Sequence, residues 1–345
     1  MPLNLDNLPS RRDEAWKWTD VHGRVTEGQS GLSVEGQPKF IAPKGVSISQ
    51  SAGSVSETPM AKLAQNVAPQ SWEITVPADF ADGEALHIED ISRGHLRVDI
   101  KLGKSARLTV IEHHSGDAGA FVNLDMQIHL AEGANLTRVI VHDDPSETVR
   151  IATATIHSQK NARFNQFALS FGGGLTRLET RLNVMGEGFE ANMNGAYLLG
   201  EQRHCDMSSH IDLERPDCTI RQAVKGVVTD KARGVFQGKF LVQRPAQHTD
   251  AEMRHDALML SESSEIRSKP ELEIYADDVA CAHGNTIGQL DESALFYMQQ
   301  RGIPIGQARA LLTEAFLADV FDDLDDEDLK DSILDKIRGW LRTVS

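Results

Sequence analysis

The sequence contains few cysteines, few aromatic residues and no long apolar run. Only three of its 345 residues are cysteines, Cys205, Cys218 and Cys281, and none of them forms a CxxC motif. This number and spacing exclude a disulfide-rich scaffold and a zinc knuckle. No stretch approaches the length of a transmembrane helix, and the N-terminus lacks the apolar core of a signal peptide. These absences predict a protein of the reducing cytoplasm.

Basic side chains are outnumbered by acidic ones, 35 against 51, and the formal net charge is −16. Such a surface repels phosphate backbones, and no basic stripe compensates for it, so nucleic acid is not expected as a partner. Part of the negative charge is concentrated in residues 319–335, a pattern typical of a solvated helix face or tail. Aromatic residues make up 6% and glycines number 27, which favours a β structure with many turns.

Short β-branched runs begin near residue 70, and each ends at a turn residue. Ala106, Ala134 and Ala162 occupy the same place in three successive runs, at a constant spacing (134 − 106 = 162 − 134 = 28). Equal spacing of short strands indicates a solenoid, in which each coil stacks on the one before it. The alternative is a β-sandwich with coincidental near-repeats, but most of the runs lack the hairpin turns that a sandwich needs.

The sequence divides into three parts. Residues 1–70 are predicted to be a helical and irregular N-terminal segment, and residues 71–290 the repeating all-β core. Residues 291–345 have helical periodicity, with Asp291 as an N-cap, Gly302 as a stop signal and a last helix at about 326–342. The first long helix of this part is predicted to place six apolar residues on one face: Ala308, Leu311, Leu312, Ala315, Phe316 and Val320.

Two glycine-containing segments match nucleotide-binding motifs only in part. Residues 234–239 (GVFQGK) have three rather than four residues between the glycines, and Phe240 stands where a magnesium-binding Ser or Thr is needed. Residues 186–191 (GEGFEA) are not followed by a helical pattern. Both are predicted to be turns of the solenoid, so the chain is not expected to bind ATP itself.

Residues 269–297 contain the strongest candidate site. Because side chains alternate along an extended strand, four of them are expected on the same side: Asp277, Val279, Cys281 and His283. A thiolate and an imidazole two residues apart can bind one soft metal ion such as iron or zinc. By itself, such a pair is more often a buried cysteine next to a hydrogen-bonded histidine.

Residues 269–302 resemble the C-terminal signature of the SufB/SufD family of iron–sulfur cluster assembly scaffolds. The resemblance rests on YADDVACAHGNTIGQLD followed by LFYMQQRGI, and the CxHG element after the acidic pair is similar to the SufD branch. RRDEAWKWTD (11–20) is similar to the N-terminal element of the family. The resemblance implies a right-handed parallel β-helix, in agreement with the repeats. Little of the chain precedes Trp16 to form the N-terminal helical domain that longer members carry.

The resemblance also implies a function. The chain would be a non-enzymatic scaffold subunit that pairs with a SufB-type homologue and binds a SufC-type ABC ATPase through the helices after Asp291. Cys281 and His283 match positions that face the SufB-type partner, where a transient iron–sulfur cluster or iron would assemble, with His283 as the stronger candidate. No tightly bound cofactor is expected on this chain alone, and the isolated subunit could form a homodimer.

Two other functions remain open. A polysaccharide-acting solenoid enzyme would need paired carboxylates, and Asp277 and Asp278 are the only adjacent pair in the late strands, but four Trp and three Tyr provide few sugar platforms. A purely structural, homo-oligomeric subunit is the other alternative. Cys205, Cys218 and the remaining histidines match no signature, and the group of His204, Cys205 and His210 is predicted to be structural rather than metal-binding.

Overall fold

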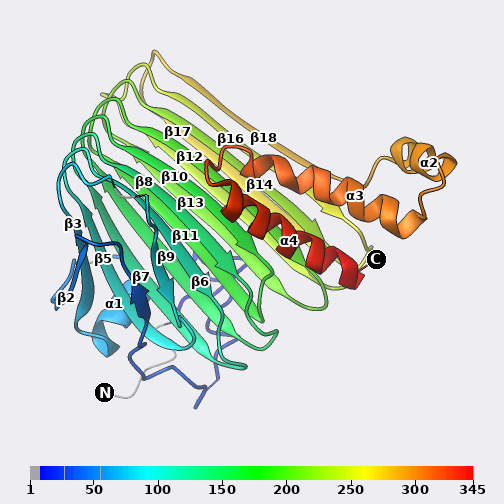
Figure 1. Ribbon diagram of the computed structural model, residues 1–345, viewed down its shortest axis with the longest axis horizontal. Helices are drawn as coiled ribbons and strands as arrows, with labels where there is room; N and C mark the ends of the chain where they lie inside the picture. Colours follow the sequence, from blue (N-terminus) through cyan, green and yellow to red (C-terminus); the bar gives the residue numbers. More distant parts are fainter. Residues whose placement is uncertain (1–7, 27, 55, 82, 345) are drawn as a thin grey trace.

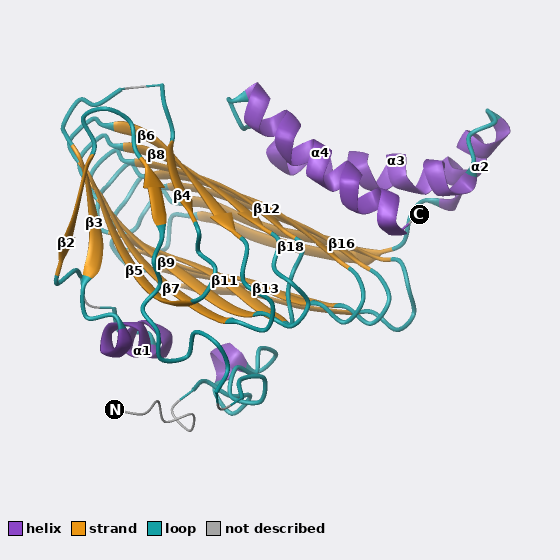
Figure 2. Cartoon of the chain, turned by 60° about the horizontal axis from the view of Figure 1, so that its bottom comes forward, coloured by secondary structure: helices purple, strands orange, loops and turns teal. Residues whose placement is uncertain are grey.

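A parallel β-solenoid forms most of the chain in the computed structural model, which describes residues 8–26, 28–54, 56–81 and 83–344 (Figures 1 and 2). From β3 onward the strands alternate between two facing sheets, so that each coil contributes one strand to each sheet. Strands that neighbour each other in a sheet are therefore separated in the sequence by a complete coil. The predicted β-solenoid with a small helical part at its C-terminal end is confirmed.

The two sheets have nine strands each within the described residues. Sheet I contains, in spatial order, β1 (Lys39–Ile41), β4 (Leu86–Glu89), β6 (Arg107–His114), β8 (Asn135–His142), β10 (Arg163–Ser170), β12 (Glu190–Leu199), β14 (Thr219–Val228), β16 (Asp250–Met259) and β18 (Ala280–Gly288). Sheet II contains β2 (Ser47–Ser51), β3 (Ser71–Val76), β5 (Gly94–Leu102), β7 (Phe121–Leu130), β9 (Val149–Ser158), β11 (Leu175–Val184), β13 (His204–Leu213), β15 (Arg233–Val242) and β17 (Glu265–Ile274).

The 28-residue repeat seen in the sequence is the length of the coils around it, whereas a later coil is longer, since Thr219 pairs with Asp250 (250 − 219 = 31). Arg107 pairs with Asn135, and Asn135 pairs with Arg163, so each strand lies one repeat from its neighbour. Ala106, Ala134 and Ala162 are all fully buried just before these strands. The next coil has Phe189 at the equivalent position, which is also fully buried, so this corner accepts a large apolar residue as well. The apolar core lies between the two sheets.

The N-terminal segment packs on the outer face of sheet II. A short 3-10 helix, η2 (Glu14–Trp16), buries Trp16 under the guanidinium group of Arg177, which lies 4.2 Å from the ring centroid. Arg177 also donates to the carbonyl of Ala15, and the hydroxyl of Thr19 donates to Asp206. Helix α1 (Pro59–Val67) covers the same sheet nearer the start of the solenoid (Figure 2).

The two ends of the solenoid differ. At its N-terminal end, β1 pairs antiparallel with β4, and β2 pairs antiparallel with β3. These short strands cover the edges of the first coil, in a region that the sequence predicted only as a helical and irregular segment. At the C-terminal end, β17 and β18 are the outermost strands of their sheets in the described chain. Their outer edges present unpaired backbone groups.

Four helical elements follow the last strand: α2 (Glu292–Gln300), α3 (Ile305–Ala318), η3 (Asp319–Phe321) and α4 (Glu327–Val344). The Asp291 side chain caps α2 by accepting from the Ser293 amide, and Gly302 has a positive φ after its end, as predicted. Apolar side chains of α3, η3 and α4 pack on the outer face of sheet I. Helix α2 projects beyond the strands (Figures 1 and 2).

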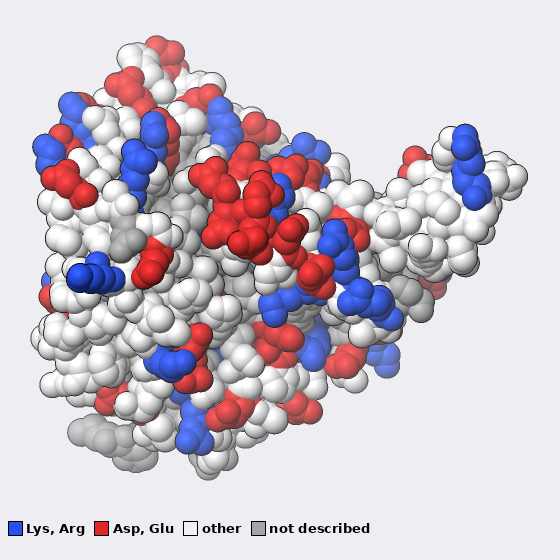
Figure 3. Space-filling model, in the orientation of Figure 1, with Lys and Arg blue, Asp and Glu red and all other residues white. Residues whose placement is uncertain are grey.

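An acidic surface marks the connection between η3 and α4. Figure 3 shows a dense group of Asp and Glu side chains there. The Asp326 side chain accepts from the Leu329 amide, and further acidic residues, including Glu327 and Asp328, lie in the first turn of α4, where they interact favourably with the helix dipole. The predicted solvated acidic helix face is thus the start of α4. No helix in the described part of the chain is both long and apolar enough to span a bilayer.

Candidate functional site

Cys281 and His283 lie on β18, the last strand of sheet I. In the parallel register, Cys281 is opposite Ala251 and His283 is opposite Met253. Ala251 and Met253 are buried in the solenoid core, so Cys281 and His283 occupy the corresponding inward positions of the last coil. His283 is nevertheless exposed, because no strand stacks on β18 among the described residues. The end of the solenoid therefore presents both side chains at its surface.

The structure corrects the predicted position of Asp277. This residue lies in the bend between β17 and β18 rather than in an extended strand with Cys281. A bend interrupts the period-two alternation on which the prediction rested. Val279 and Cys281 both pack against the interior core, as expected for neighbours on one side. The strand itself contributes Cys281 and His283 to the candidate site, and Asp277 lies outside this row.

The Cys281 thiol is half-buried and not bonded to another cysteine. Burial raises its pKa, the carboxylate of Asp250 raises it further, and the hydrogen bond with the Ala251 backbone partly opposes this rise. The side chain is therefore a neutral thiol at neutral pH. A metal ion that binds it must displace the thiol proton.

These two side chains do not form a complete metal site. In the part of the chain that the structure describes, no group of three His, Cys, Asp or Glu side chains with ligand atoms within 4.8 Å of one another includes Cys281 or His283. Iron–sulfur clusters and tetrahedral metal sites require about four protein ligands. A complete site at this end of the solenoid would need ligands from outside the described chain.

A buried histidine, His255, lies on the strand next to the candidate site. His255 of β16 is opposite Asn285 of β18, two residues after His283. His255 Nδ1 lies 3.0 Å from Asn285 Oδ1 and donates to it. His255 Nε2 lies 2.9 Å from the Tyr197 hydroxyl and accepts from it. Burial lowers the pKa of His255 to about 4, which keeps the ring neutral. The His255 ring also stacks on the Phe236 ring, with centroids 4.8 Å apart, so the hydrogen-bond partner of Asn285 is itself packed in the core.

The structure divides the six apolar residues that were predicted on one face of the C-terminal helices. Ala308 and Val320 are buried, Leu312 and Phe316 are partly buried, and Leu311 and Ala315 are exposed. Part of this set therefore packs towards the solenoid and part faces solvent, while a role of the six residues in binding a partner stays a prediction. Of the six, only Leu311 and Ala315 are classed as exposed.

Two aromatic residues of α2 are more exposed than Leu311, which is 43% exposed. Phe296 is 63% and Tyr297 58% exposed, on the helix that projects beyond the solenoid (Figure 2). In the sequence they belong to the LFYMQQRGI motif, and nothing in that motif predicts their exposure. A cleft of about 770 Å³ lies next to them, between α2, α3 and α4 and the end of the solenoid, and Ile287 and Leu295 are among its lining residues.

The profile of one protein family, described as "SUF system FeS cluster assembly, SufBD core domain", matches residues 88–316. The chain belongs to the SufBD family. The matched range includes the second half of β4, the strands from β5 to β18, α2 and most of α3. It therefore covers both the solenoid and the start of the helical part of this SufBD-family chain.

Individual relatives agree with this assignment. The chain is 31% identical to the iron–sulfur cluster assembly protein SufD of Escherichia coli K12, over 72% of its own length and 59% of that protein. It is 33% identical to a SufBD family protein of Synechocystis over 59% and 45% of the two lengths, and 26% identical to one of Mycobacterium bovis over 91% and 84%. The chain thus spans about half the length of the first two relatives. The resemblance to the SufD branch is confirmed.

Two neighbouring residues of the SufBD-family chain, His204 and Cys205, have structural surroundings. Cys205 and His204 are adjacent on β13 and therefore point to opposite faces of the sheet. Cys205 is in the core, 3.3 Å from the Ser170 hydroxyl, and burial raises its pKa to about 12. His204 is buried beneath the N-terminal segment, 3.4 Å from the Thr19 hydroxyl. The predicted structural role of His204 and Cys205 agrees with these positions.

Both glycine-containing segments belong to the solenoid, but only residues 186–191 include the predicted turn, because residues 234–239 are part of a strand. Residues 234–239 lie inside β15, where Gly234 makes room for the Tyr197 ring and Gly238 for the Met253 side chain. Residues 186–191 form the turn that leads into β12. A phosphate loop requires a strand followed by a loop and a helix, and neither segment has this arrangement.

Proposed function

We propose that this chain is a non-ATPase scaffold subunit for iron–sulfur cluster assembly, which pairs with a SufB-type subunit through the C-terminal end of its solenoid. The observation that carries the proposal is the position of Cys281 and His283 at this uncapped end. The E. coli relative is named an iron–sulfur cluster assembly protein, and we extend that role to this chain. Iron and sulfide are the cargo of the site rather than a resident cofactor.

The end of the solenoid has the properties of a pairing surface. The outer edges of β17 and β18 carry unpaired backbone donors and acceptors, which another strand can satisfy. Three large apolar side chains are exposed near these edges: Ile274, Tyr275 and Ile287. A second solenoid that presents its own last coil would bury these side chains and pair the strand edges. A related SufB-type subunit is the partner that fits this geometry.

The seam between the subunits would complete the ligand set. Cys281 and His283 supply one sulfur and one nitrogen, which are suitable ligands for iron. The partner would supply the remaining ligands, in agreement with the incomplete set on this chain. His283 is the better candidate, because it is exposed, whereas Cys281 is half-buried and protonated.

The projecting helices are the proposed contact with a SufC-type ABC ATPase. Phe296, Tyr297 and Leu311 are exposed apolar anchors of the kind that protein interfaces use. Helices α3 and α4 pack firmly on the outer face of sheet I. A movement imposed on these helices by ATP-driven association of two ATPase subunits would therefore be transmitted to the solenoid and could open the seam.

The test is anaerobic co-expression of the chain with its SufB-type and SufC-type partners, followed by measurement of bound iron and sulfide. His283→Ala is expected to reduce the cluster yield at least tenfold while the complex still co-purifies. His129→Ala, which removes a histidine from the middle of sheet II, is the matched control and should retain the normal yield. A normal cluster yield in His283→Ala and in Cys281→Ala would instead favour a purely structural subunit.

The two partner surfaces are tested separately. Ile287→Asp is expected to abolish co-purification of the SufB-type subunit, because a carboxylate would have to be buried at the seam. Phe296→Ala combined with Tyr297→Ala should release the ATPase but retain the SufB-type subunit. If neither variant changes the composition of the complex, the assignment of these surfaces is wrong.

A further inference from the structure

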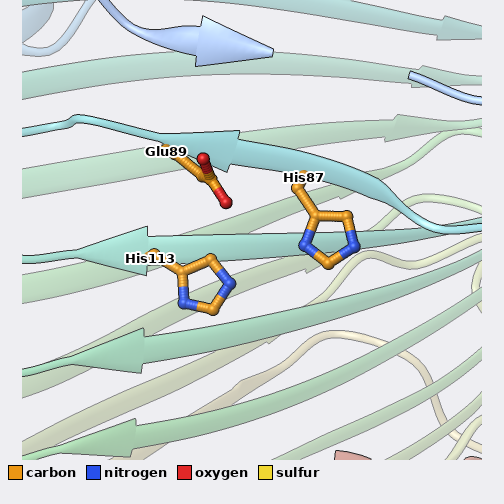
Figure 4. A group of neighbouring side chains, drawn as sticks. All are labelled: His87, Glu89 and His113. Carbon is orange, nitrogen blue, oxygen red and sulfur yellow. The ribbon is translucent and has the colours of Figure 1, made fainter. Parts of the chain in front are cut away.

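Three potential metal ligands lie together at the other end of the solenoid. His87 and Glu89 are two residues apart on β4, and His113 is on the adjacent strand β6 (Figure 4). The nearest ligand atoms of the three side chains all lie within 4.8 Å of one another. Each side chain is partly buried. The group was not apparent in the sequence, since β4 and β6 are separated by a turn of the solenoid.

The strand geometry explains why these side chains meet. Leu86 and Ile88 point into the core, so His87 and Glu89 point outward, by the alternation of a strand. On β6, Val110 belongs to the core and Ile111 packs on the outer face. His113 is two residues after Ile111 and therefore also lies on the outer face. This face is the one on which α4 packs, and the group lies beside the covered area.

The geometry is close to that of a metal site. The two imidazole rings are stacked, with centroids 6.0 Å apart and an angle of 4° between their planes. Around a metal ion with ligand bonds of about 2.1 Å, ligand atoms are roughly 3–4 Å apart. Modest side-chain rotations would therefore bring the nitrogens and the carboxylate oxygen to these distances. Two imidazoles and a carboxylate suit a divalent first-row transition ion.

The charges around the group allow this binding. Lys39 lies 2.7 Å from Glu89 Oε2, so a bound cation would share or displace this ion pair. The salt bridge uses one carboxylate oxygen, and the other can face the metal.

We propose that His87, Glu89 and His113 form a binding site for one divalent transition-metal ion, Zn²⁺ or Fe²⁺, with water in the remaining positions. The site is separate from the proposed cluster-assembly end, because β4 and β18 are seven strand spacings apart in sheet I, or roughly 30 Å. It does not depend on the proposed function. The bound ion would link the second strand of sheet I to the third, next to the C-terminal helix.

The experiment is a titration of the chelator-treated full chain with Co²⁺, monitored by visible absorption, and with Zn²⁺, monitored by calorimetry. One equivalent of Co²⁺ is expected to bind and to be displaced by Zn²⁺. His87→Ala and His113→Ala should each weaken binding at least tenfold, and Glu89→Gln several-fold. Lys39→Met should strengthen binding several-fold, because it removes the cation that competes for Glu89. A merely structural Glu89–Lys39 pair would not give this increase.

Two controls separate this site from other ligands of the chain. Cys281→Ser, titrated in parallel, removes the thiol at the other end and should leave the binding unchanged. His129→Ala disrupts a second stacked histidine pair, His129 and His157, with ring centroids 4.9 Å apart but no third ligand in the described chain. It should also leave binding unchanged. Binding that survives in both His87→Ala and His113→Ala, or the absence of stoichiometric binding in the unmodified chain, would overturn the proposal.

Discussion

At the scale of single residues, the interior of the solenoid contains a buried carboxylate, Glu112, that pairs with a buried arginine. Arg138 donates to both carboxylate oxygens of Glu112, at 2.5 and 2.9 Å, and also to Gln166. His114 contacts the same carboxylate at 2.9 Å. Burial raises the pKa of Glu112, but the Arg138 charge and these hydrogen bonds outweigh it and lower the pKa to about 2. Removing either partner of such a pair would leave a buried charge uncompensated.

Buried neutral histidines make the stability of the fold sensitive to acid. Burial lowers the pKa of His95, His114 and His255 to about 4, below the ordinary value of 6.5. As the pH falls from 6.5 towards 4, the unfolded chain takes up protons that the folded chain does not, so the free energy of unfolding decreases. Each of these histidines contributes a loss of up to about 3 kcal/mol. Asp125, whose pKa burial raises to about 6, acts in the opposite sense below pH 6.

We therefore expect the free energy of unfolding, measured by urea titration, to be several kcal/mol lower at pH 4.5 than at pH 7. His95→Gln should flatten this dependence, because it removes one proton-binding group of the unfolded chain. The exposed His248→Gln is the matched control. An unchanged slope in His95→Gln would show that burial of this ring does not set the acid sensitivity.

At the scale of elements, one corner of the solenoid is built from residues with left-handed backbone conformation. Ser105, Gly133 and Asn161 have φ values of 56°, 69° and 53°, each directly before a fully buried alanine. A left-handed residue lets the chain reverse its course within one or two positions. Only glycine, and to a lesser degree Asn and Asp, adopts this conformation readily.

The corner conformation predicts how substitutions at residue 161 behave. Asn161→Val should lower the free energy of unfolding by about 1–2 kcal/mol, because a β-branched residue is strained at positive φ. Asn161→Gly should be close to neutral or slightly stabilising. Urea titration of both variants measures the difference. Equal stability of the Val and Gly variants would contradict the corner argument.

At the scale of the whole molecule, the asymmetry between the two ends of the solenoid is the dominant feature. A solenoid repeats along one direction, and each coil is stabilised by its neighbours, so a terminal coil without a cover is a site of association. The antiparallel strands β1 and β2 cover the N-terminal end. The described C-terminal end has no equivalent, and Cys281 and His283 lie there.

This asymmetry predicts self-association when no partner is present. The isolated chain should dimerise through its C-terminal end in sedimentation velocity experiments at micromolar concentrations. Ile287→Asp should shift it to a monomer. Ile41→Asp places the same charge at an equally exposed isoleucine of β1, at the covered end, and should not change the oligomeric state. If Ile41→Asp disrupts the dimer and Ile287→Asp does not, the interface is at the N-terminal end and the prediction is wrong.

Sequence alone was sufficient for features that depend on neighbouring residues. The spacing of Ala106, Ala134 and Ala162 indicated the length of the coils that contain them, because consecutive strands of one sheet start at the same point of successive coils. The cap at Asp291 and the stop at Gly302 determined the bounds of α2, because helix ends are satisfied by local groups. The motif around Cys281 and His283 indicated the family.

Only the tertiary structure decided which side of each element is covered. Ala308 and Leu311 are on the same helix, yet one is buried and the other exposed, because the covering sheet comes from distant parts of the chain. His87 and His113 meet only because one full coil brings β4 beside β6. Period and capping are local and can be predicted from the sequence, whereas exposure and ligand proximity depend on how the coils stack.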